Sequence, residues 1–487
     1  MMRGASLPRI SSSRAGLPRP ARVWLCAALM ALGLPVAHGA QAVPVAVRAD
    51  PAPVKPRIIV LSDIGNEPDD SESLVRFLLY ANEFDVEGLI ATTSIWQRDK
   101  VRPDLMLERI AGYAQVRDNL NHHAQGYPTA EALRGKVIAG APLYGMAGVG
   151  QAHDTAASRA IIAAVDKPDA RPVWVLCWGG AVDLAQALWS VRATRGPEQV
   201  KQFVARLRVY SISDQDDAGP WARREFPQLF WIASIHGWGQ YNMAAWSGIS
   251  GDRRTAERWP DRETVQDPWL SANIRRGPLG SLYPLPAFIM EGDTPAFLYL
   301  IPNGLSDPEH PEWGSWGGRY MQQSPGMGLY ADSKDIFERD GTLYSGNQAG
   351  VYRWRGSFQN DFAARIGWTL TPDPKQTNHA PVASVQGQAG RGVLHLTAKS
   401  GETITLDASA SRDPDGNAIH AHWWQYREVG GIPPQPPVTF ASANALTTQA
   451  TMPSVTKPAT LHLILEVSDN GTPALTAYRR LIVDVQP

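Results

Sequence analysis

The sequence predicts two folded domains, an α/β domain with a mostly parallel sheet flanked by helices and a smaller all-β sandwich. The chain has 487 residues, which is more than one domain usually contains. Short apolar strands alternate with helical patterns from residue 57 to about residue 213, as is typical of a parallel sheet covered on both faces. Beyond residue 381, apolar and polar residues alternate at period two, as in the strands of a sandwich.

The first forty residues have the composition of a secretory signal peptide. They contain five arginines and no acid, and an apolar run extends from Val23 to Val36. Small residues at 37–40 suit cleavage near Ala40, and the apolar run is short for a membrane span. We therefore expect segment 1–40 to be removed and the protein to be periplasmic or secreted in a bacterium. An uncleaved anchor is the alternative.

Removal of this segment leaves 41 basic and 47 acidic residues, a formal net charge of −6. This balance does not support binding to nucleic acid or to an anionic membrane, and we expect no stable membrane span in the mature protein. Cys26 leaves with the segment, so Cys177 is alone and no intramolecular disulfide can form. Cys177 lies in an apolar strand and is interpreted as inert core. An exported bacterial protein of this kind relies on its core for stability.

Residues 41–56, rich in Pro, Ala and Val, are predicted to form a flexible leader, and the α/β domain to occupy residues 57–369. Its expected strands are 58–61, 85–93, 136–140, 172–177 and 207–213. Its expected helices begin near Asp69 and at 103–116, 155–165 and 181–191.

From Trp221 to Tyr320 the chain is irregular and dense in aromatic residues. Aromatic faces stack on sugar rings, but they also fill the cores of loop-rich regions. Core packing is the better interpretation for any single residue, whereas the set is consistent with a carbohydrate cleft lined by at least two of them. The set comprises Trp221, Trp231, Trp238, Tyr241, Trp246, Trp259, Trp269, Trp313 and Trp316.

Residues 370–381 have the composition of a linker, and residues 382–487 are predicted to form an immunoglobulin-like sandwich. Its clearest strands are 403–408, 421–426 and 461–467. Asp413-Pro-Asp-Gly-Asn417 has the spacing of the start of a calcium loop, but Trp424 stands where the closing acid is required. We interpret this segment as a turn, with calcium binding as the lesser alternative.

The connection between the strand at 58–61 and the following helix contains several acidic residues. Gly65-Asn66-Glu67-Pro68 has turn composition, and Asp69 or Asp70 is expected to cap the helix that follows. This connection, with Asp63 at its start, lies at the carboxyl ends of the strands, where open α/β sheets bind ligands. Like charges this close repel unless a cation or a shared proton compensates, and hard oxygen ligands favour Ca²⁺ or Mg²⁺. The alternative is an acidic helix start with solvated neighbours.

This connection resembles the aspartate signature of the nucleoside hydrolase superfamily, and three further segments match in the same order. They are Thr92-Thr93, Leu176-Cys-Trp178-Gly-Gly-Ala-Val-Asp183-Leu-Ala and Met290-Glu-Gly-Asp293-Thr-Pro-Ala. Together the matches cover roughly residues 57–340. With the sandwich appended, the layout is similar to a bacterial family of cellulose-binding, nucleoside-hydrolase-like proteins, which implies the same α/β fold.

The resemblance implies one Ca²⁺ held between carboxylates, a backbone carbonyl and two vicinal hydroxyls of a sugar. By this pattern Asp63, Asp70 and Asp293 are metal ligands, and Trp178 offers its backbone carbonyl. Asp69 accepts a hydrogen bond from a sugar hydroxyl. Asp63 also serves as the general base, reached through a longer loop than is usual. The alternative is that Asp63 is an upstream structural aspartate and that the base is missing.

Other positions differ from the residues with which the family recognises a nucleoside. Gly292 stands where the family has a histidine, and Arg224-Glu225-Phe226-Pro227 only partly echoes its ribose-gripping element. The asparagine expected after the second strand falls near Ile95-Trp96. We therefore expect a carbohydrate or glycoside whose diol faces calcium. The further expected substrate contacts are Asn66, Glu67, Trp96 and Trp238.

These features predict hydrolysis of an N- or O-glycosidic bond in a plant-polysaccharide-related or nucleoside-like sugar. Asp63 would take a proton from the attacking water, and the other carboxylates would stabilise the oxocarbenium-like sugar. His236 is the candidate proton donor for the leaving group, although a structural, hydrogen-bonded histidine is the better interpretation. The alternative function is a non-catalytic, cellulose-binding protein that uses the same cleft and aromatic residues.

Overall fold

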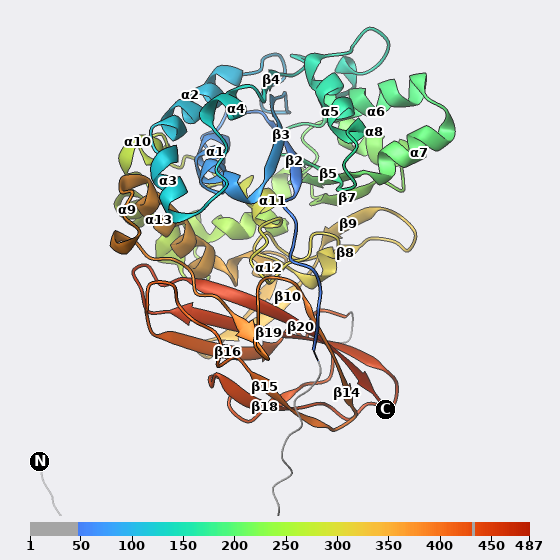
Figure 1. Ribbon diagram of the computed structural model, residues 1–487. Coiled ribbons are helices and arrows are strands. Elements are labelled where there is room, and N and C mark those ends of the chain that lie inside the picture. Colours follow the sequence, from blue (N-terminus) through green and yellow to red (C-terminus); the bar gives the residue numbers. More distant parts are fainter. Residues whose placement is uncertain (1–46, 431–433) are drawn as a thin grey trace, which may run out of the picture. The chain divides into compact units, whose positions relative to one another are not determined.

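The computed structural model describes residues 47–430 and 434–487, apart from the side chain of Trp238 (Figure 1). The predicted signal peptide and the start of the leader lie outside these residues. None of the helices in the described ranges is long and apolar enough to cross a membrane. The predicted fold class is confirmed, because a mostly parallel sheet with flanking helices is followed by a strand-rich region.

The α/β domain contains an eight-stranded sheet in the order β4-β3-β2-β5-β6-β7-β9-β8. Neighbouring strands are parallel except for β8 and β9, which pair antiparallel at one edge. The strands are β2 Arg57–Ser62, β3 Asp85–Ala91, β4 Val137–Ala139, β5 Val173–Cys177, β6 Leu207–Ser211, β7 Phe230–Ala233, β8 Tyr320–Gln322 and β9 Leu329–Asp332.

Helices cover both faces of this sheet, with α1–α4 and α5–α8 on opposite sides (Figure 1). Successive β2 residues point to opposite faces: Ile58 and Val60 join one core cluster, and Ile59 and Leu61 join the other. All four side chains are fully buried, and the burial of each contributes about 1.5–3 kcal/mol to the stability of the fold. The helices that flank the sheet, and the long helix α13, are α1 Asp69–Leu79, α2 Pro103–Ala114, α3 Arg117–His123, α4 Ala130–Arg134, α5 Ala156–Asp166, α6 Val182–Thr194, α7 Pro197–Ala205, α8 Ala218–Glu225 and α13 Arg355–Leu370.

The predicted strands and helices between residues 57 and 213 correspond to β2–β6 and to α1, α2, α5 and α6. The region predicted to be irregular contains β7 and the start of β8, as well as the short helices α9 Asp267–Asn273, α10 Gly277–Gly280 and α11 Thr294–Leu298. These elements are too short to produce a clear periodicity. The helix-cap prediction was wrong. Pro68 is the N-cap of α1, while Asp69 and Asp70 form its first turn.

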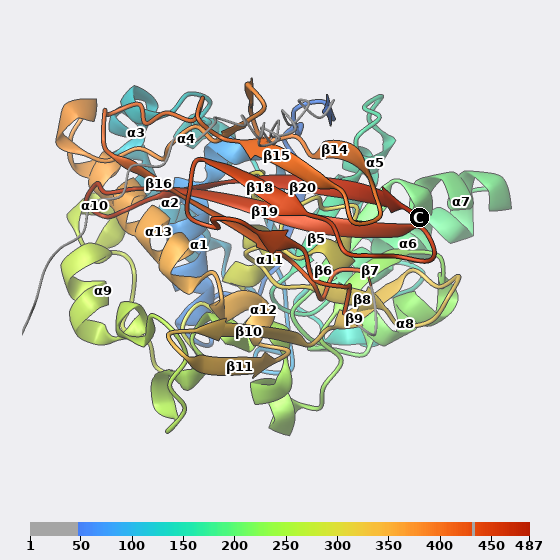
Figure 2. The same cartoon turned by 90° about the horizontal axis from the view of Figure 1, so that it is seen from below.

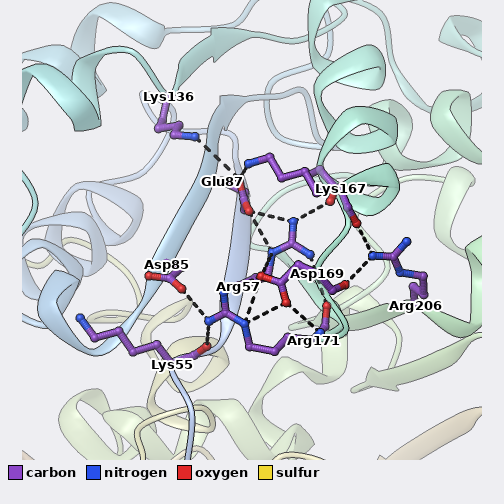
Figure 3. Close-up of polar contacts among 10 residues, drawn as sticks. Lys55, Arg57, Asp85, Glu87, Lys136, Lys167, Asp169, Arg171 and Arg206 are labelled. Carbon is purple, nitrogen blue, oxygen red and sulfur yellow. Dashed lines mark hydrogen bonds and ion pairs between the residues drawn. The ribbon is translucent and has the colours of Figure 1, made fainter.

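Figure 3 shows a polar network at the amino ends of the strands, opposite to the end that carries Asp63. The buried Arg57 guanidinium pairs with Glu87 at 2.8 Å and donates to a backbone carbonyl at 2.6 Å. Arg171 pairs with Asp85 and with Asp169, each at 2.6 Å. Each of these carboxylates therefore has a cationic partner, which anchors the start of β2.

The leader differs from the prediction of a flexible segment. Residues Arg48–Ala49 form strand β1, which pairs antiparallel with β14 of the strand-rich region. Asp50 continues this contact, because it pairs with His395 at 2.8 Å. Without β1, β14 would be an open edge, and edge strands are commonly covered by another segment.

The strand-rich region forms two main sheets, in the orders β1-β14-β20-β19-β16 and β15-β18-β17 (Figure 2). Their inward side chains form a separate core cluster that includes Trp423 and Leu463. In the Asp413 turn, the Asp413 carboxylate accepts the backbone N–H groups of Asp415 and Asn417. The strands are β12 Ser384–Val385, β13 Gln388–Ala389, β14 Leu394–Lys399, β15 Thr403–Asp407, β16 Ile419–Gln425, β17 Thr439–Phe440, β18 Thr447–Thr451, β19 Ala459–Asp469 and β20 Thr476–Gln486.

A buried carboxylate, Asp335, links the hairpin β10 Asp335–Arg339 and β11 Thr342–Gly346 to the strand-rich region. It pairs with Arg319 at 2.5 Å and Arg353 at 2.8 Å, and it accepts the hydroxyl of Tyr426 at 2.5 Å. Burial opposes ionisation of Asp335, but the two guanidinium groups outweigh it and hold its pKa below the ordinary value. Tyr426 follows β16, so this network joins the two regions of the chain.

We expect Asp335→Asn to lower the free energy of unfolding by about 3–5 kcal/mol, because it leaves the buried Arg319 without its counter-charge and leaves Arg353 with only its longer pair to Glu428. Urea denaturation measures this change. The matched control is Glu309→Gln, which breaks the more exposed pair between Arg208 and Glu309 at 2.8 Å and should cost no more than about 1 kcal/mol. Equal losses in the two variants would contradict the role of the buried network.

Candidate functional site

A cavity of about 270 Å³ opens at the carboxyl ends of the strands. Acidic side chains from the β2–α1 connection and from the start of α11 line one part of it, and aromatic side chains line another. The lining residues are Asp63, Asn66, Glu67, Asp69, Asp70, Trp96, Trp178, Ile212, Gln215, Tyr241, Asn242, Trp246, Ser247, Gly251, Phe288, Ile289 and Asp293. The sheet thus brings together segments that lie 230 residues apart in the sequence.

Asp63 directly follows β2 and is held by the segment after β3. The Ser94 hydroxyl donates to its carboxylate, and the Gln97 amide donates to its backbone carbonyl at 3.1 Å. Gly179 allows Asp63 to approach the end of β5, since a Cβ at that position would lie 2.7 Å from the carboxylate. The position of Asp63 therefore depends on three neighbouring strand ends.

Asp69 and Asp70 occupy the first turn of α1, where the helix dipole favours negative charge. The Ser62 hydroxyl donates to Asp70 and links it to the last residue of β2. Every residue of α1 is buried, so the two carboxylates stand on a rigid element.

A buried ion pair between helix α1 and the segment just before Asp293 positions Asp293. Arg76 pairs with Glu291 at 2.8 Å, and Glu72 accepts the backbone N–H of Glu291 at 2.8 Å. Glu291 has a φ of 53°, a strained left-handed conformation that these contacts hold in place. Asp293, two residues later, presents a buried carboxylate oxygen that has no hydrogen-bond partner among the described residues.

The carboxylates raise one another's pKa. Burial raises the pKa of Asp63 to about 6 and that of Asp69 to about 8, and nearby acids add to both shifts. Burial and the charges of Asp63 and Asp69 hold the pKa of Asp70 well above its ordinary value. Burial raises the pKa of Asp293 well above its ordinary value, and the negative charges of Asp70, Asp69 and Asp63 raise it further. The cluster therefore disfavours its own ionisation unless a cation binds.

One oxygen from each of Asp69, Asp70 and Asp293 lies within 4.8 Å of the others, which is close enough to hold one metal ion. Three buried carboxylates and an unpartnered Asp293 oxygen fit a hard divalent cation. This triad contains Asp69, which the resemblance assigned to a sugar hydroxyl, and it lacks Asp63, which was predicted as a ligand. Asp63 lies outside this triad, and its carboxylate accepts the Ser94 hydroxyl.

The structure brings most of the predicted site residues into this cavity. Asn66, Glu67 and Trp96 line it together with the four aspartates. The Trp178 side chain is buried among Phe77 and Phe297, and its carbonyl accepts the Gln215 amide.

Three predicted features lie elsewhere or outside the described residues. His236 does not line the cavity, and its ring pairs with Asp332 at 2.9 Å. The hydrogen bond to Asp332 raises the pKa of His236. Trp238 begins a short 3₁₀ segment, but its side chain lies outside the described part of the structure. Phe226 packs on Trp221 at the end of α8, so this echo of a ribose-gripping element does not reach the cavity.

Of the aromatic set, Tyr241 and Trp246 line the cavity, whereas Trp231 and Trp316 are core residues. Sequence reasoning missed Ser94, Gln215, Phe288 and Ile289. Ser94 and Gln215 follow the ends of β3 and β6, and Phe288 and Ile289 precede Asp293 by a few residues. Their positions next to strand ends and to a predicted ligand were the signal that could have found them.

Residues 57–320 match the family described as "Cellulose-binding Sde182, nucleoside hydrolase-like domain". Residues 403–485 match the family described as "Cellulose-binding protein Sde0182, C-terminal domain". A solved structure of a nucleoside hydrolase-related hypothetical protein from Saccharophagus degradans, associated with carbohydrate metabolism, has 35% sequence identity. The similarity covers 89% of this chain and 100% of that chain, with a TM-score of 0.75.

No curated protein matches the chain. Among other solved structures, the effector protein XOO4466 has 12% identity over 66% of this chain and 93% of that chain. Its TM-score of 0.29 carries no argument about function.

The carboxylate cluster predicts a stability that depends on pH and on calcium. A carboxyl group whose pKa is raised by folding binds more protons folded than unfolded between its two pKa values. In chelator, Asp63 and Asp69 should therefore make the free energy of unfolding fall as pH rises from about 4 to 8. Calcium should raise the melting temperature, and more strongly at pH 8 than at pH 5.5. Thermal unfolding with and without calcium measures both effects.

Two variants locate the calcium effect. Asp293→Asn should abolish most of the calcium-dependent rise in melting temperature, because it removes one carboxylate of the triad. Asp413→Asn should leave this rise in melting temperature unchanged, because the Asp413 carboxylate accepts a backbone hydrogen bond within its own turn. The opposite pattern would place the calcium site in the strand-rich region.

Proposed function

Because the chain belongs to the cellulose-binding Sde182 family with a nucleoside hydrolase-like domain, we propose that it is a calcium-dependent hydrolase of glycosyl bonds. The proposal rests mainly on one observation: Asp63, the buried carboxylate triad and several aromatic side chains line the same cavity. A glycosidase needs a base, negative charge near the anomeric carbon and a surface that orients the sugar.

Asp63 acts as the general base in this proposal. Burial raises its pKa to about 6 in the absence of a cation, and a calcium ion in the triad would lower this pKa, so the carboxylate is ionised at pH 7 and can accept a proton. The Ser94 hydroxyl and the close approach to Gly179 hold the carboxylate in one orientation. Asp63 thereby takes a proton from the water that attacks the anomeric carbon.

Asp69, Asp70, Asp293 and the carbonyl of Trp178 would hold the calcium ion. Bound there, calcium would offset the repulsion among the carboxylates and bind two vicinal hydroxyls of a sugar. The carboxylates around the ring stabilise the positive charge that develops on the sugar in the transition state.

The substrate proposed is a carbohydrate or glycoside rather than a common nucleoside. Gly292 replaces the family's histidine, and a Cβ there would lie only 3.0 Å from the Asp69 carboxylate. Trp96, Tyr241, Trp246 and Phe288 offer ring faces for a sugar or for its leaving group. The cavity of about 270 Å³ suits one sugar ring at the end of a chain or a small glycoside.

The second candidate function is glycan binding without cleavage, with calcium and the aromatic wall holding a sugar. The observation that favours it is the position of His236, which leaves the cavity without a histidine proton donor among its lining residues. A shared fold does not by itself imply shared catalysis.

We also propose that the protein is exported, on the basis of the predicted signal peptide at residues 1–40. Fractionation of cells that express the full chain, followed by N-terminal sequencing, tests this proposal. Protein retained in the cytoplasm with its first residues intact would contradict it.

Release of reducing sugar or free base from a panel of glycosides, with and without chelator, tests the hydrolase proposal. Asp63→Asn should lower the hydrolysis rate by about 10²–10⁴-fold, the usual contribution of a positioned general base. It should change calcium-dependent stability far less, because the triad keeps its three carboxylates.

Asp70→Asn is the matched variant, because it should weaken both metal binding and sugar binding by removing a charged ligand. If the wild type binds glycans but cleaves no compound in the panel, and Asp63→Asn leaves binding unchanged, glycan binding replaces hydrolysis as the function.

We expect His236→Asn to lower hydrolysis by less than about tenfold, since His236 lies outside the cavity lining. Rates measured on paired glycosides with good and poor leaving groups check this. A loss of 100-fold or more that is confined to poor leaving groups would instead identify His236 as the proton donor.

A further inference from the structure

We propose that a groove between the hairpin β10–β11 and strand β16 is a second carbohydrate-binding site, which holds a neutral glucan chain. The inference rests on the carbohydrate ligand of the proposed function but not on hydrolysis. The groove has a volume of about 550 Å³, about twice that of the acidic cavity and within the usual range for ligand sites of about 300–1,000 Å³. The two cavities share no lining residue.

Trp424 contributes a large aromatic ring to the lining of the groove. On β16, Trp423 points into the sandwich core and is 1% exposed, so its neighbour Trp424 must point to the opposite face of the sheet. Trp424 is half-buried there and lines the groove. Its ring lies 5.9 Å from that of Trp354, with an interplanar angle of 38°. A large aromatic ring at the edge of a cavity is the usual platform for a sugar ring.

Arg353 holds the aromatic wall of the groove in place. Its guanidinium group lies 4.9 Å from the centre of the Trp424 ring and 5.0 Å from that of Phe337. The same group pairs with Asp335 at 2.8 Å and with Glu428 at 3.4 Å. Both sides of the groove are thereby tied to one buried network, so a ligand meets a surface that is already ordered.

Glu466 provides an acceptor for sugar hydroxyls. One of its carboxylate oxygens accepts the Trp424 indole N–H at 3.0 Å, and the register of β16 with β19 places His422 directly opposite. Within residues 47–430 and 434–487, Glu466 forms no ion pair, and burial raises its pKa. A carboxylate in this setting gains from hydroxyl donors of a ligand, as a partly desolvated acceptor does.

The charge of the groove favours a neutral ligand. Three arginines line it together with three glutamates, so their formal charges cancel. An anionic polysaccharide, a phosphate or a basic peptide would meet as much repulsion as attraction there. Aromatic faces combined with balanced donors and acceptors instead suit the hydroxyls and apolar ring faces of a glucan. The charged lining residues are Arg339, Arg353, Arg427, Glu338, Glu428 and Glu466.

Binding of cellohexaose by calorimetry, and of amorphous cellulose by co-sedimentation, tests the groove in the full chain. Trp424→Ala and Glu466→Gln should each raise the Kd for cellohexaose at least about fivefold, as expected for a central binding residue. The matched control is Trp221→Ala, which removes a half-buried Trp that lines neither cavity and should bind as the wild type.

Trp424 also packs on Trp354 and Tyr426, so an unfolded variant must be distinguished from a binding-deficient one. An unchanged calcium-dependent rise in melting temperature shows that Trp424→Ala is folded, and Glu466→Gln keeps the packing atoms in place. Wild-type affinity in both groove variants, or no binding of either glucan by the wild type, would overturn the inference. Absence of hydrolysis would leave the test intact.

Discussion

Mutual repulsion among buried carboxylates at the carboxyl end of β2 is the constraint on which the site depends. Asp69, Asp70 and Asp293 bring one oxygen each within 4.8 Å, and Asp63 adds its charge to theirs. Burying a charge without a partner costs several kcal/mol, so the arrangement is unfavourable in the ionised state unless a cation binds. The rest of the fold stabilises this arrangement against that repulsion.

The charged side chains at the two ends of the parallel strands differ in their pairing. At the amino ends, Arg57 and Arg171 pair with the carboxylates that surround them (Figure 3). At the carboxyl ends, Asp63 and Asp70 accept serine hydroxyls, and among the described residues the four aspartates have no cationic partner. The buried pair between Arg76 and Glu291 is placed behind the site and orients the Asp293 segment without neutralising it. The paired charges thus anchor the sheet, and the carboxylates without cationic partners form the proposed cation site.

The strand-rich region is integrated with the α/β domain. Tyr426 donates its hydroxyl to the buried Asp335 network, and strand β1, which precedes the α/β domain, pairs with β14. A groove lined by residues of both regions, including Trp424, follows from this contact. The proposed glycan recognition at the groove and the proposed chemistry at the acidic cavity would then be separate properties of one chain, as a family with a nucleoside hydrolase-like domain and a cellulose-binding name allows.

The sequence by itself determined the parallel sheet, the sandwich and the loop that carries Asp63, Asp69 and Asp70, because these depend on local periodicity and turn composition. It could not determine that Asp69 rather than Asp63 joins Asp293 in the triad, since a side chain's direction depends on contacts such as the Ser94 hydroxyl. Short strands such as β7, the pairing of the leader with β14, and the position of His236 were likewise decided by tertiary structure. Each depends on neighbours far away in the sequence, which no local pattern records.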